Sequence, residues 1–497
     1  MTTKKKILCL LLVVIVSFAN LHSMFATTTP EKPQIKNIIF MIPDGGAMTP
    51  FYLADYVKQA GGLTDTFPNA TPVEKGEMYI KQYLVGAEYT RSANSIVTDS
   101  AASGTALSSG YRTNNKMVGI TPEKTPRANI LEACQELGKK TGIVVTYEFS
   151  NATPAAFSSH AESRYDTLEI AEQVVNQKID VVFGNTLPEY EDQEWFTDES
   201  FEKRGYDVIK SKEQLSSIKA GDRVWGKLPS PSFDIEREAS TPNLAELTKA
   251  ALTALDDGSE EGFFLMVEGS AVDGGGHRSD ALIMVSEYLA FDEACKVAIE
   301  FAKKRNDTMV VIMPDHDTGG LTTGNSYARS SLEALVPEIR AGIDPDYIVW
   351  EGNKEHTYRY GGIFMYVPEG IAYPAGIDKS KAAQLAFDFE EDMKVRPTVN
   401  TIDNFQMAPY LAGLIGVDFD ASTKRLFVDI TDKGTYDSES EIFTFTNDAG
   451  SLVSIKRNTS FATVDGKSFD LDGQVAVYLN GKFYVPEKLL SATSQGK

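Results

Sequence analysis

The chain contains too few cysteines for a disulfide framework. Its 497 residues include only three cysteines, Cys9, Cys134 and Cys295. Cys9 lies in an N-terminal segment with the character of a cleaved leader, so two thiols would remain after its removal. Exported proteins that depend on disulfides are much richer in cysteine. Cys134 and Cys295 each lie in an apolar, helix-like context, and we expect them to be buried thiols rather than a bridge.

Positive charge is also scarce. The chain has 48 lysines and arginines against 70 aspartates and glutamates, which gives a formal net charge of −22. A surface of this charge repels nucleic acids and anionic membranes. We therefore expect no nucleic-acid partner, and an anionic substrate would have to be attracted by a local positive site.

Beyond its first residues, the sequence has no apolar run that suggests a membrane span. The run Ile7–Val16 follows three lysines and precedes a small-x-small triplet, an order typical of a secretory signal. The run is too short for a stable anchor. We expect residues 1–26 to be a signal peptide, cleaved after Ala19 or Ala26, and the protein to be exported, whether secreted, periplasmic or associated with the cell envelope. The C-terminal residues KLLSATSQGK contain no hydrophobic tail for a lipid anchor.

Apolar, β-branched runs alternate with helix-like segments between Asn37 and about Arg425. Strands are predicted by NIIFMI, TGIVVTY, DVVFG, GFFLMVEG and TMVVIMP, and amphipathic helices by TPRANILEACQELGKK and EYLAFDEACKVAIEFAKKR. This alternation predicts an α/β domain over residues 27–424, with a central, largely parallel sheet flanked by helices. Beyond it, short β-prone runs are separated by the hairpin-forming pairs Asp465-Gly466 and Asn480-Gly481. Residues 425–497 are predicted to form a small β-rich module.

Polar residues follow several predicted strands, at the strand ends where open α/β sheets bind ligands. They are Asp44, then Thr153 and Arg164, then Glu268, Asp273 and His277, and finally Asp315 and His316. Each has a structural alternative, because Asp44 or Asp315-His316 can simply form a turn. The chain has only five histidines, however, and two of them follow these strands beside acids. Carboxylates with imidazoles suit Zn²⁺ or a similar ion, and cations would relieve the repulsion between the acids.

The segment VTDSAASGTALSSG, Val97–Gly110, consists almost entirely of small residues. This composition is common in surface loops. It also lets a main chain approach a ligand closely, and a helix beginning near Ala101 would direct N–H groups toward an anion at Ser100. The segment alone leaves both interpretations open.

Taken together, six motifs resemble those of the alkaline phosphatase family and occur in the family's order over roughly Asn37–Ile415. They are PDGG, VTDSAASGTALSSG, NATPAAFSSHAESR, VEGSAVDGGGH, PDHDTGG and EHT. The resemblance implies a metal-dependent phosphomonoesterase in which Ser100 is the nucleophile, transiently phosphorylated, and Arg164 grips the phosphate. It also implies two Zn²⁺ ions and one Mg²⁺ ion, the first Zn²⁺ bound by Asp273, His277 and His356, the second by Asp44, Asp315 and His316, and Mg²⁺ by Asp44, Thr153 and Glu268.

Two positions depart from the family's pattern. Asn151 stands where bacterial relatives often have an aspartate that holds water around the third ion, so the Mg²⁺ site is the least secure. Gly274 stands where relatives often carry a lysine, tryptophan or histidine near the phosphate. We expect its small size to open the pocket and to weaken the retention of phosphate.

Three further features are given structural interpretations. His160 matches a family motif without a ligand role, and we expect a satisfied structural histidine. Trp195 and Trp225 lie in a polar, acidic region that we expect to be surface decoration. The C-terminal module resembles the small β module named after the copper amine oxidase stalk (N-terminal) domain, but the stretch that carries the resemblance has no histidine, cysteine or methionine for copper.

The sequence therefore predicts an exported alkaline phosphatase that acts on small-molecule phosphate monoesters. One alternative is a related phosphodiesterase or sulfatase, of which the diesterase would gain from an apolar cleft. Another is a non-catalytic envelope protein that binds phosphate or metal, although a binder needs no nucleophile. The prediction allows a homodimer, and it allows contact with the cell envelope through the C-terminal module.

Overall fold

The computed structural model describes residues 34–229, 235–323, 336–337, 339–341, 348–381 and 400–494. The predicted signal peptide, with Cys9, lies outside the described residues. Among the described helices, none has both the length and the apolar character that crossing a bilayer requires.

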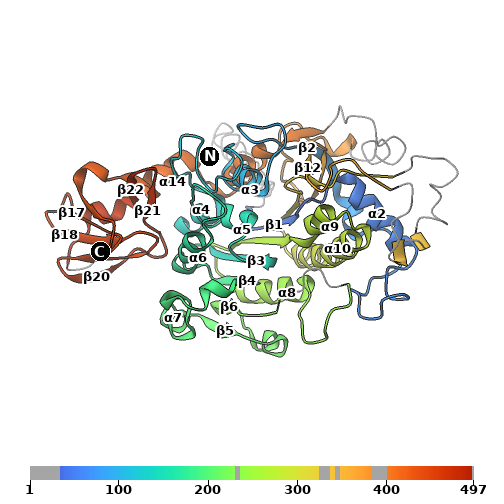
Figure 1. Ribbon diagram of the computed structural model, residues 1–497, viewed down its shortest axis with the longest axis horizontal. Helices are drawn as coiled ribbons and strands as arrows, with labels where there is room; N and C mark the ends of the chain where they lie inside the picture. Colours follow the sequence, from blue (N-terminus) through green and yellow to red (C-terminus); the bar gives the residue numbers. More distant parts are fainter. Residues whose placement is uncertain are drawn as a thin grey trace, which may run out of the picture.

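A ten-stranded mixed sheet forms the centre of the molecule (Figure 1). From one edge to the other it contains β14 (Thr401–Asp403), β2 (Leu84–Tyr89), β13 (Gly361–Tyr366), β8 (Thr308–Ile312), β1 (Asn37–Pro43), β7 (Phe263–Gly269), β3 (Lys140–Glu148), β4 (Val181–Asn185), β6 (Val224–Gly226) and β5 (Asp207–Ile209). The strands from β8 to β5 are parallel, whereas β13 is antiparallel to both of its neighbours. This confirms the predicted α/β fold with a largely parallel sheet.

The central strands are buried on both faces. All seven residues of β1 are buried. Ile39 and Met41 belong to one hydrophobic core, whereas Ile38, Phe40 and Ile42 belong to the other. Successive side chains of a strand point to opposite faces, so a strand inside a parallel sheet is apolar along its whole length. The continuous apolar runs in the sequence have this cause.

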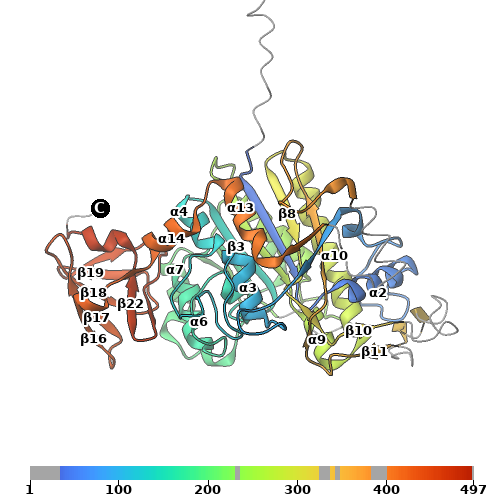
Figure 2. The same ribbon diagram turned by 90° about the horizontal axis from the view of Figure 1, so that it is seen from above.

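Helices cover the two faces of the sheet (Figure 2). One core contains side chains from α2 (Met48–Gln59), α8 (Leu244–Leu255) and α10 (Ala281–Lys303). The other contains side chains from α3 (Ser100–Ser109), α4 (Ile130–Glu136), α5 (Ala152–Ala156), α6 (Thr167–Asn176) and α13 (Met407–Ile415). Both amphipathic helices predicted from the sequence are present, as α4 and α10.

The two cysteines are buried and unpaired, as predicted. Cys134 lies in α4 and Cys295 in α10. Burial in apolar surroundings raises the pKa of the Cys134 thiol to about 12 and that of Cys295 well above its usual value. Both thiols are therefore chemically inert core residues.

The prediction for the tryptophans is wrong for Trp225, which is 0% exposed. Its ring stacks on Phe201 with centroids 4.5 Å apart and meets Phe149 edge-on at 5.1 Å. Trp195 is only partly buried and packs against the same core. Trp225 therefore belongs to an aromatic cluster that fixes the β5–β6 edge of the sheet.

The chain ends in a β-rich module at one end of the molecule, coloured red in both views (Figures 1 and 2). After α14 (Phe419–Leu426), two antiparallel sheets contain β15 (Val428–Asp429), β22 (Lys482–Val485) and β21 (Val477–Leu479), and β16 (Gly434–Asp437), β17 (Ile442–Thr446), β18 (Leu452–Lys456), β19 (Phe461–Val464) and β20 (Lys467–Asp470). The pairs Asp465-Gly466 and Asn480-Gly481 have positive φ at both positions and form the predicted hairpin turns.

Candidate active site

The predicted site residues converge at the carboxyl ends of the central strands. Asp44 follows β1, Glu268 lies near the end of β7, and Asp315 and His316 follow β8. These strands are neighbours in the sheet and run parallel, so their carboxyl ends share one edge. The structure thus brings together the polar clusters that the sequence placed after separate strands.

Ser100 is the first residue of α3. Its hydroxyl faces the acidic edge, which is the edge of the sheet where Asp44, Glu268 and Asp315 lie. The preceding Asp99 caps the helix by accepting from the Ala102 N–H at 3.0 Å. Ser100 is 3% exposed, and its Oγ lies 3.0 Å from Nε2 of His316. The positive end of a helix dipole favours negative charge at this position.

The small residues of α3 allow the helix to pack closely against its neighbours. All ten residues of α3 are buried. A Cβ on Gly104 would lie 2.9 Å from the Cβ of Ala156 in α5, so the two helices approach closely there. Ser103 Oγ also donates to the carbonyl of Asp315 at 2.6 Å. The surface-loop interpretation is therefore wrong for residues 100–109, whose small side chains pack in a buried helix.

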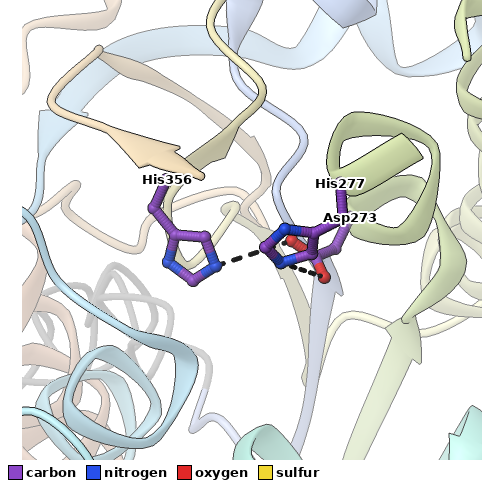
Figure 3. A group of neighbouring side chains, drawn as sticks. All are labelled: Asp273, His277 and His356. Atoms are coloured by element: carbon purple, nitrogen blue, oxygen red, sulfur yellow. Dashed lines mark ion pairs between the residues drawn. The ribbon is translucent and has the colours of Figure 1, made fainter. Parts of the chain in front are cut away.

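One group of potential metal ligands is formed by Asp273, His277 and His356 (Figure 3). The helix α9 (Ala271–Arg278) carries the first two, one turn apart, and the short strand β12 (His356–Thr357) carries the third. Nε2 of His277 lies 3.3 Å from Asp273 Oδ2, and Nε2 of His356 lies 3.8 Å from Asp273 Oδ1. Backbone carbonyls of Lys354 and Thr98 face the Nδ1 atoms of His277 and His356 at 2.5 and 2.9 Å, and so orient both rings.

A second group contains Asp44, Asp273 and His316, with Asp315 beside it. Nε2 of His316 lies 3.5 Å from Asp44 Oδ1 and 3.1 Å from Asp315 Oδ2. Asp315 Oδ1 accepts from the backbone N–H groups of Gly45 and His316 at 3.1 and 3.0 Å. This arrangement leaves the other Asp315 oxygen facing His316. Asp273 lies between the two groups, so they are adjacent.

A third set of oxygens, from Asp44, Thr153 and Glu268, lies deeper. Within the described part of the chain, Asp44 Oδ1, Thr153 Oγ1 and both Glu268 carboxylate oxygens are buried without a hydrogen-bond partner. Buried polar atoms are nearly always satisfied in native proteins. An all-oxygen set of this kind suits a hard cation such as Mg²⁺.

The acids at this edge strongly perturb one another. Burial and the charges of Asp315, Asp273 and Glu268 raise the pKa of Asp44 well above its usual value. Burial raises the pKa of Glu268 to about 7, and the charge of Asp315 adds to the shift. Burial opposes ionisation of Asp315, but His316, the Gly45 N–H and His356 together outweigh it and lower that pKa to about 2. Carboxylates this crowded need cations if all of them are to ionise.

Burial and the nearby His316 lower the pKa of His356 to about 4. The two rings stack with centroids 3.6 Å apart. At neutral pH, His356 therefore presents a neutral imidazole, which is the form that binds metal ions.

Arg164 lies beside Ser100 in a pocket of about 430 Å³. Its Nη1 donates to Asp99 Oδ2 at 3.3 Å and its Nη2 to Asn151 Oδ1 at 3.4 Å. The pocket is lined by Asp44, Ser100, Tyr147, Asn151, Arg164, Ser270, Asp273, Gly274, His277 and Arg278. Gly274 is thus part of the pocket wall, as predicted.

Sequence reasoning missed several residues of the site. Thr318 Oγ1 donates to Asp273 Oδ1 at 2.5 Å and lies 3.1 Å from Nδ1 of His316. Tyr147 and Arg278 line the pocket. Thr318 lies inside the PDHDTGG motif and Arg278 directly follows the VEGSAVDGGGH motif, so closeness to a motif was the available signal. Tyr147 belongs to a buried strand, where aromatic residues are common, so the sequence did not indicate a place in the pocket.

His160 has the structural role that was predicted. It is 2% exposed, its Nε2 lies 2.8 Å from Glu132 Oε1, and its Nδ1 lies 2.6 Å from the carbonyl of Gly119. Both ring nitrogens are satisfied, and the ring is not among the groups that could hold a metal.

Comparison with known proteins identifies a family. The family model described as "Alkaline phosphatase" matches residues 35–341. Alkaline phosphatase 4 of Bacillus subtilis is 33% identical over 376 residues, which cover 72% of this chain and 78% of the relative. The alkaline phosphatase of Escherichia coli is 30% identical over 395 residues, which cover 68% of this chain and 82% of the relative.

Solved structures show the same fold. The alkaline phosphatase of Thermus thermophilus superposes with a TM-score of 0.61 at 21% identity, over 79% of this chain and 95% of that one. The cold-active enzyme of Shewanella sp. gives 0.58 at 24% identity, over 76% and 99%. The family model ends before His356 and the C-terminal module.

Proposed function

The chain belongs to the alkaline phosphatase family, and from this premise we propose that it hydrolyses phosphate monoesters through a phosphoseryl intermediate on Ser100. The observation that carries the proposal is the position of Ser100, whose hydroxyl meets His316 at the N-terminus of a buried helix, beside the acidic edge. A protein that only binds phosphate or metal would have no use for a hydroxyl held there.

The donor sets fit the metal ions that the family resemblance implies. We assign one Zn²⁺ to Asp273, His277 and His356, and the second to Asp44, Asp315 and His316, because these mixed carboxylate and imidazole groups suit zinc. We assign Mg²⁺ to the buried oxygens of Asp44, Thr153 and Glu268. When bound, such ions supply the positive charge that favours an ionised serine and a departing alkoxide.

The chain's own residues account for the rest of the reaction. Ser100 Oγ attacks phosphorus, a Ser–O–P bond forms, and the ester P–O bond breaks as the alcohol leaves. Water then attacks the phosphoserine, which releases inorganic phosphate and restores the hydroxyl. Arg164 binds two phosphate oxygens through its planar guanidinium, and the N-terminal end of α3 favours their charge.

Asn151 and Gly274 are the two positions at which this pocket departs from the family's pattern. Asn151 Oδ1 accepts from the Ala152 N–H at 2.7 Å, so it caps α5, and it also contacts Arg164. An uncharged amide there neither repels nor strongly attracts a hydrated cation, and we propose that the Mg²⁺ site is weak. Gly274 adds no cation to the pocket wall, so product phosphate should leave readily.

The substrate and the cellular location are proposed from fewer observations than the reaction. Every lining residue except Gly274 has a polar or charged side-chain group, and two are arginines, which favours a compact, doubly charged monoester over a diester with two organic groups. Export is proposed from residues 1–26 alone. The homodimer, the envelope contact, the amine-oxidase resemblance and the domain boundaries at residues 26 and 424 stay predictions from the sequence.

The test compares metal content with activity. Protein purified without chelator should contain zinc and hydrolyse a mono-aryl phosphate, and chelation should remove both properties until zinc and magnesium are restored. A bis-aryl phosphate and an aryl sulfate should be far poorer substrates. Faster turnover of the diester or the sulfate would instead favour the related phosphodiesterase or sulfatase, and full activity of metal-free protein would refute the metal assignment.

A further inference from the structure

The tip of a hairpin in the C-terminal module contacts the loop that carries Arg164. The turn Asn480-Gly481 joins β21 to β22, and the Asn480 N–H donates to Glu162 Oε1 at 2.8 Å. Lys124 Nζ lies 2.5 Å from the other oxygen of Glu162. The hydrogen bond from Lys124, and to a smaller extent that from the Asn480 N–H, lowers the pKa of Glu162. The carboxylate is therefore ionised at neutral pH. Glu162 is two residues from Arg164 and joins the module to the α/β domain.

An apolar contact supports the same connection. Val477, Leu479 and Tyr484 of the module form a small buried cluster with Ile120. Ile120 ends a segment that is paired with the Arg164 loop through the Val118–Ala161 bridge. Burying aliphatic side chains in this way stabilises the contact between the module and this segment. The module therefore packs against the segment that is paired with the Arg164 loop.

The backbone of Arg164 is held by that paired segment. Its N–H donates to the Lys116 carbonyl at 2.8 Å, and the Lys116 N–H donates to Asp99 Oδ2 at 3.0 Å. Among the described residues, the guanidinium hydrogen-bonds to Asp99 and Asn151 alone, at the long distances of 3.3 and 3.4 Å. The position of the guanidinium in the pocket thus depends largely on where the loop backbone lies.

A second connection reaches the start of the same loop. Gln173 Nε2 in α6 donates to the His160 carbonyl at 3.0 Å and to Asn458 Oδ1 of the module at 3.2 Å. The ring of Phe427, which directly precedes β15, meets the His160 ring edge-on at 4.6 Å. The loop from His160 to Arg164 is therefore contacted at its beginning and near its end by the C-terminal part of the chain.

From these contacts we propose that the C-terminal module positions Arg164, with Glu162 and the Asn480-Gly481 turn as the positioning residues. Neither touches the pocket, so they act through the loop and not on the substrate. The proposal rests on the proposed function only in assigning Arg164 to the phosphate. It gives the module a role inside this enzyme that requires no outside partner.

The experiment uses the full chain with zinc and magnesium bound. Glu162→Ala removes both connections of the carboxylate and should raise the KM for an aryl phosphate and the inhibition constant of inorganic phosphate about threefold to tenfold, with a smaller change in kcat. Glu162→Gln keeps an acceptor for the Asn480 N–H and should lie closer to the wild type. Lys124→Ala is the matched control, because it removes the other partner and leaves the module contact in place.

An Arg164→Ala background separates positioning from general destabilisation. If Glu162 acts through Arg164, adding Glu162→Ala to Arg164→Ala should change phosphate affinity no further. An equal loss in both backgrounds, or unchanged phosphate affinity in a folded Glu162→Ala protein, would overturn the proposal. Val477→Ala perturbs the contact from the module side and should raise the same two constants. Absence of phosphatase activity in the wild type would refute the proposed function instead, and direct calorimetry of inorganic phosphate would still test the positioning.

Discussion

Replacing Thr318 with valine should weaken both zinc sites, because its hydroxyl orients one ligand of each. The hydroxyl donates to Asp273 Oδ1 at 2.5 Å, so its oxygen is left to accept from Nδ1 of His316 at 3.1 Å. We assign the His316 proton to Nδ1 from this hydrogen-bond pattern. A metal ion bound here would displace any proton on Nε2, which faces Ser100 and the acids, so Nε2 would be the ligand atom.

The size of the effect follows from burial and charge. Thr318 is 0% exposed, so water cannot replace the lost hydroxyl. A hydrogen bond to a charged group contributes about 1.5–3 kcal/mol, which corresponds to about a 10- to 150-fold change in an equilibrium constant. Substitutions of groups that orient metal ligands lower affinity or activity by about 10- to 100-fold. We therefore expect a loss of zinc affinity and of kcat/KM in that range.

The assay is competition for zinc with a chromophoric chelator, alongside kcat/KM for an aryl phosphate. Valine nearly matches the shape of threonine, so Thr318→Val removes the two hydrogen bonds with little change in volume. Thr318→Ser keeps the hydroxyl and is the control. A folded Thr318→Val protein with wild-type zinc affinity and rate would refute the role given to this hydroxyl and the tautomer assigned to His316.

Three further changes have defined outcomes. His356→Ala should lower the bound zinc by about one equivalent and reduce activity sharply, since the site proposed for it has three ligands among the described residues; full zinc content would show that His356 is not a ligand. Gly274→Lys with Asn151→Asp adds a cation to the pocket wall and a carboxylate near the Mg²⁺ oxygens, so inhibition by inorganic phosphate should strengthen and turnover at saturating substrate should fall; equal inhibition in the metallated variant would refute this. Burial raises the pKa of Glu169 from 4.5 to about 7. The folded state therefore binds more protons between these values, and this group lowers the free energy of unfolding as pH rises through them; denaturant unfolding of Glu169→Gln should show a flatter pH dependence, and an unchanged profile would contradict it.

Much of the α/β fold could be predicted because its parallel strands are buried on both faces. Their apolar runs, such as NIIFMI and TMVVIMP, are visible without knowledge of their partners. The antiparallel strand β13 could not be assigned in this way, because pairing direction depends on contacts between distant segments. Trp225 was misplaced for a similar reason. Its neighbours Phe149 and Phe201 are far from it in sequence, and the polar residues around it hide its burial.

The candidate site was predictable where its residues follow strands. Asp44, Glu268 and Asp315 all come directly from the strand-end rule. The position of Thr318 in the PDHDTGG motif could place it near the site, but it could not show that the hydroxyl bridges two ligands, because those contacts depend on the fold. The connection between the module and Arg164 was also invisible, since Glu162 and Asn480 are separated by most of the chain and meet through a backbone N–H.

The central claim is that Ser100 becomes phosphorylated during turnover, and rapid acid quenching of the enzyme with a mono-aryl phosphate tests it directly. Mass spectrometry of the digested protein should find one phosphate on the peptide that contains Ser100. Ser100→Ala should show no such phosphate and should lose activity by orders of magnitude while keeping its zinc, because Ser100 is not among the assigned metal ligands. Phosphate trapped on another residue, or full activity in Ser100→Ala, would contradict the account.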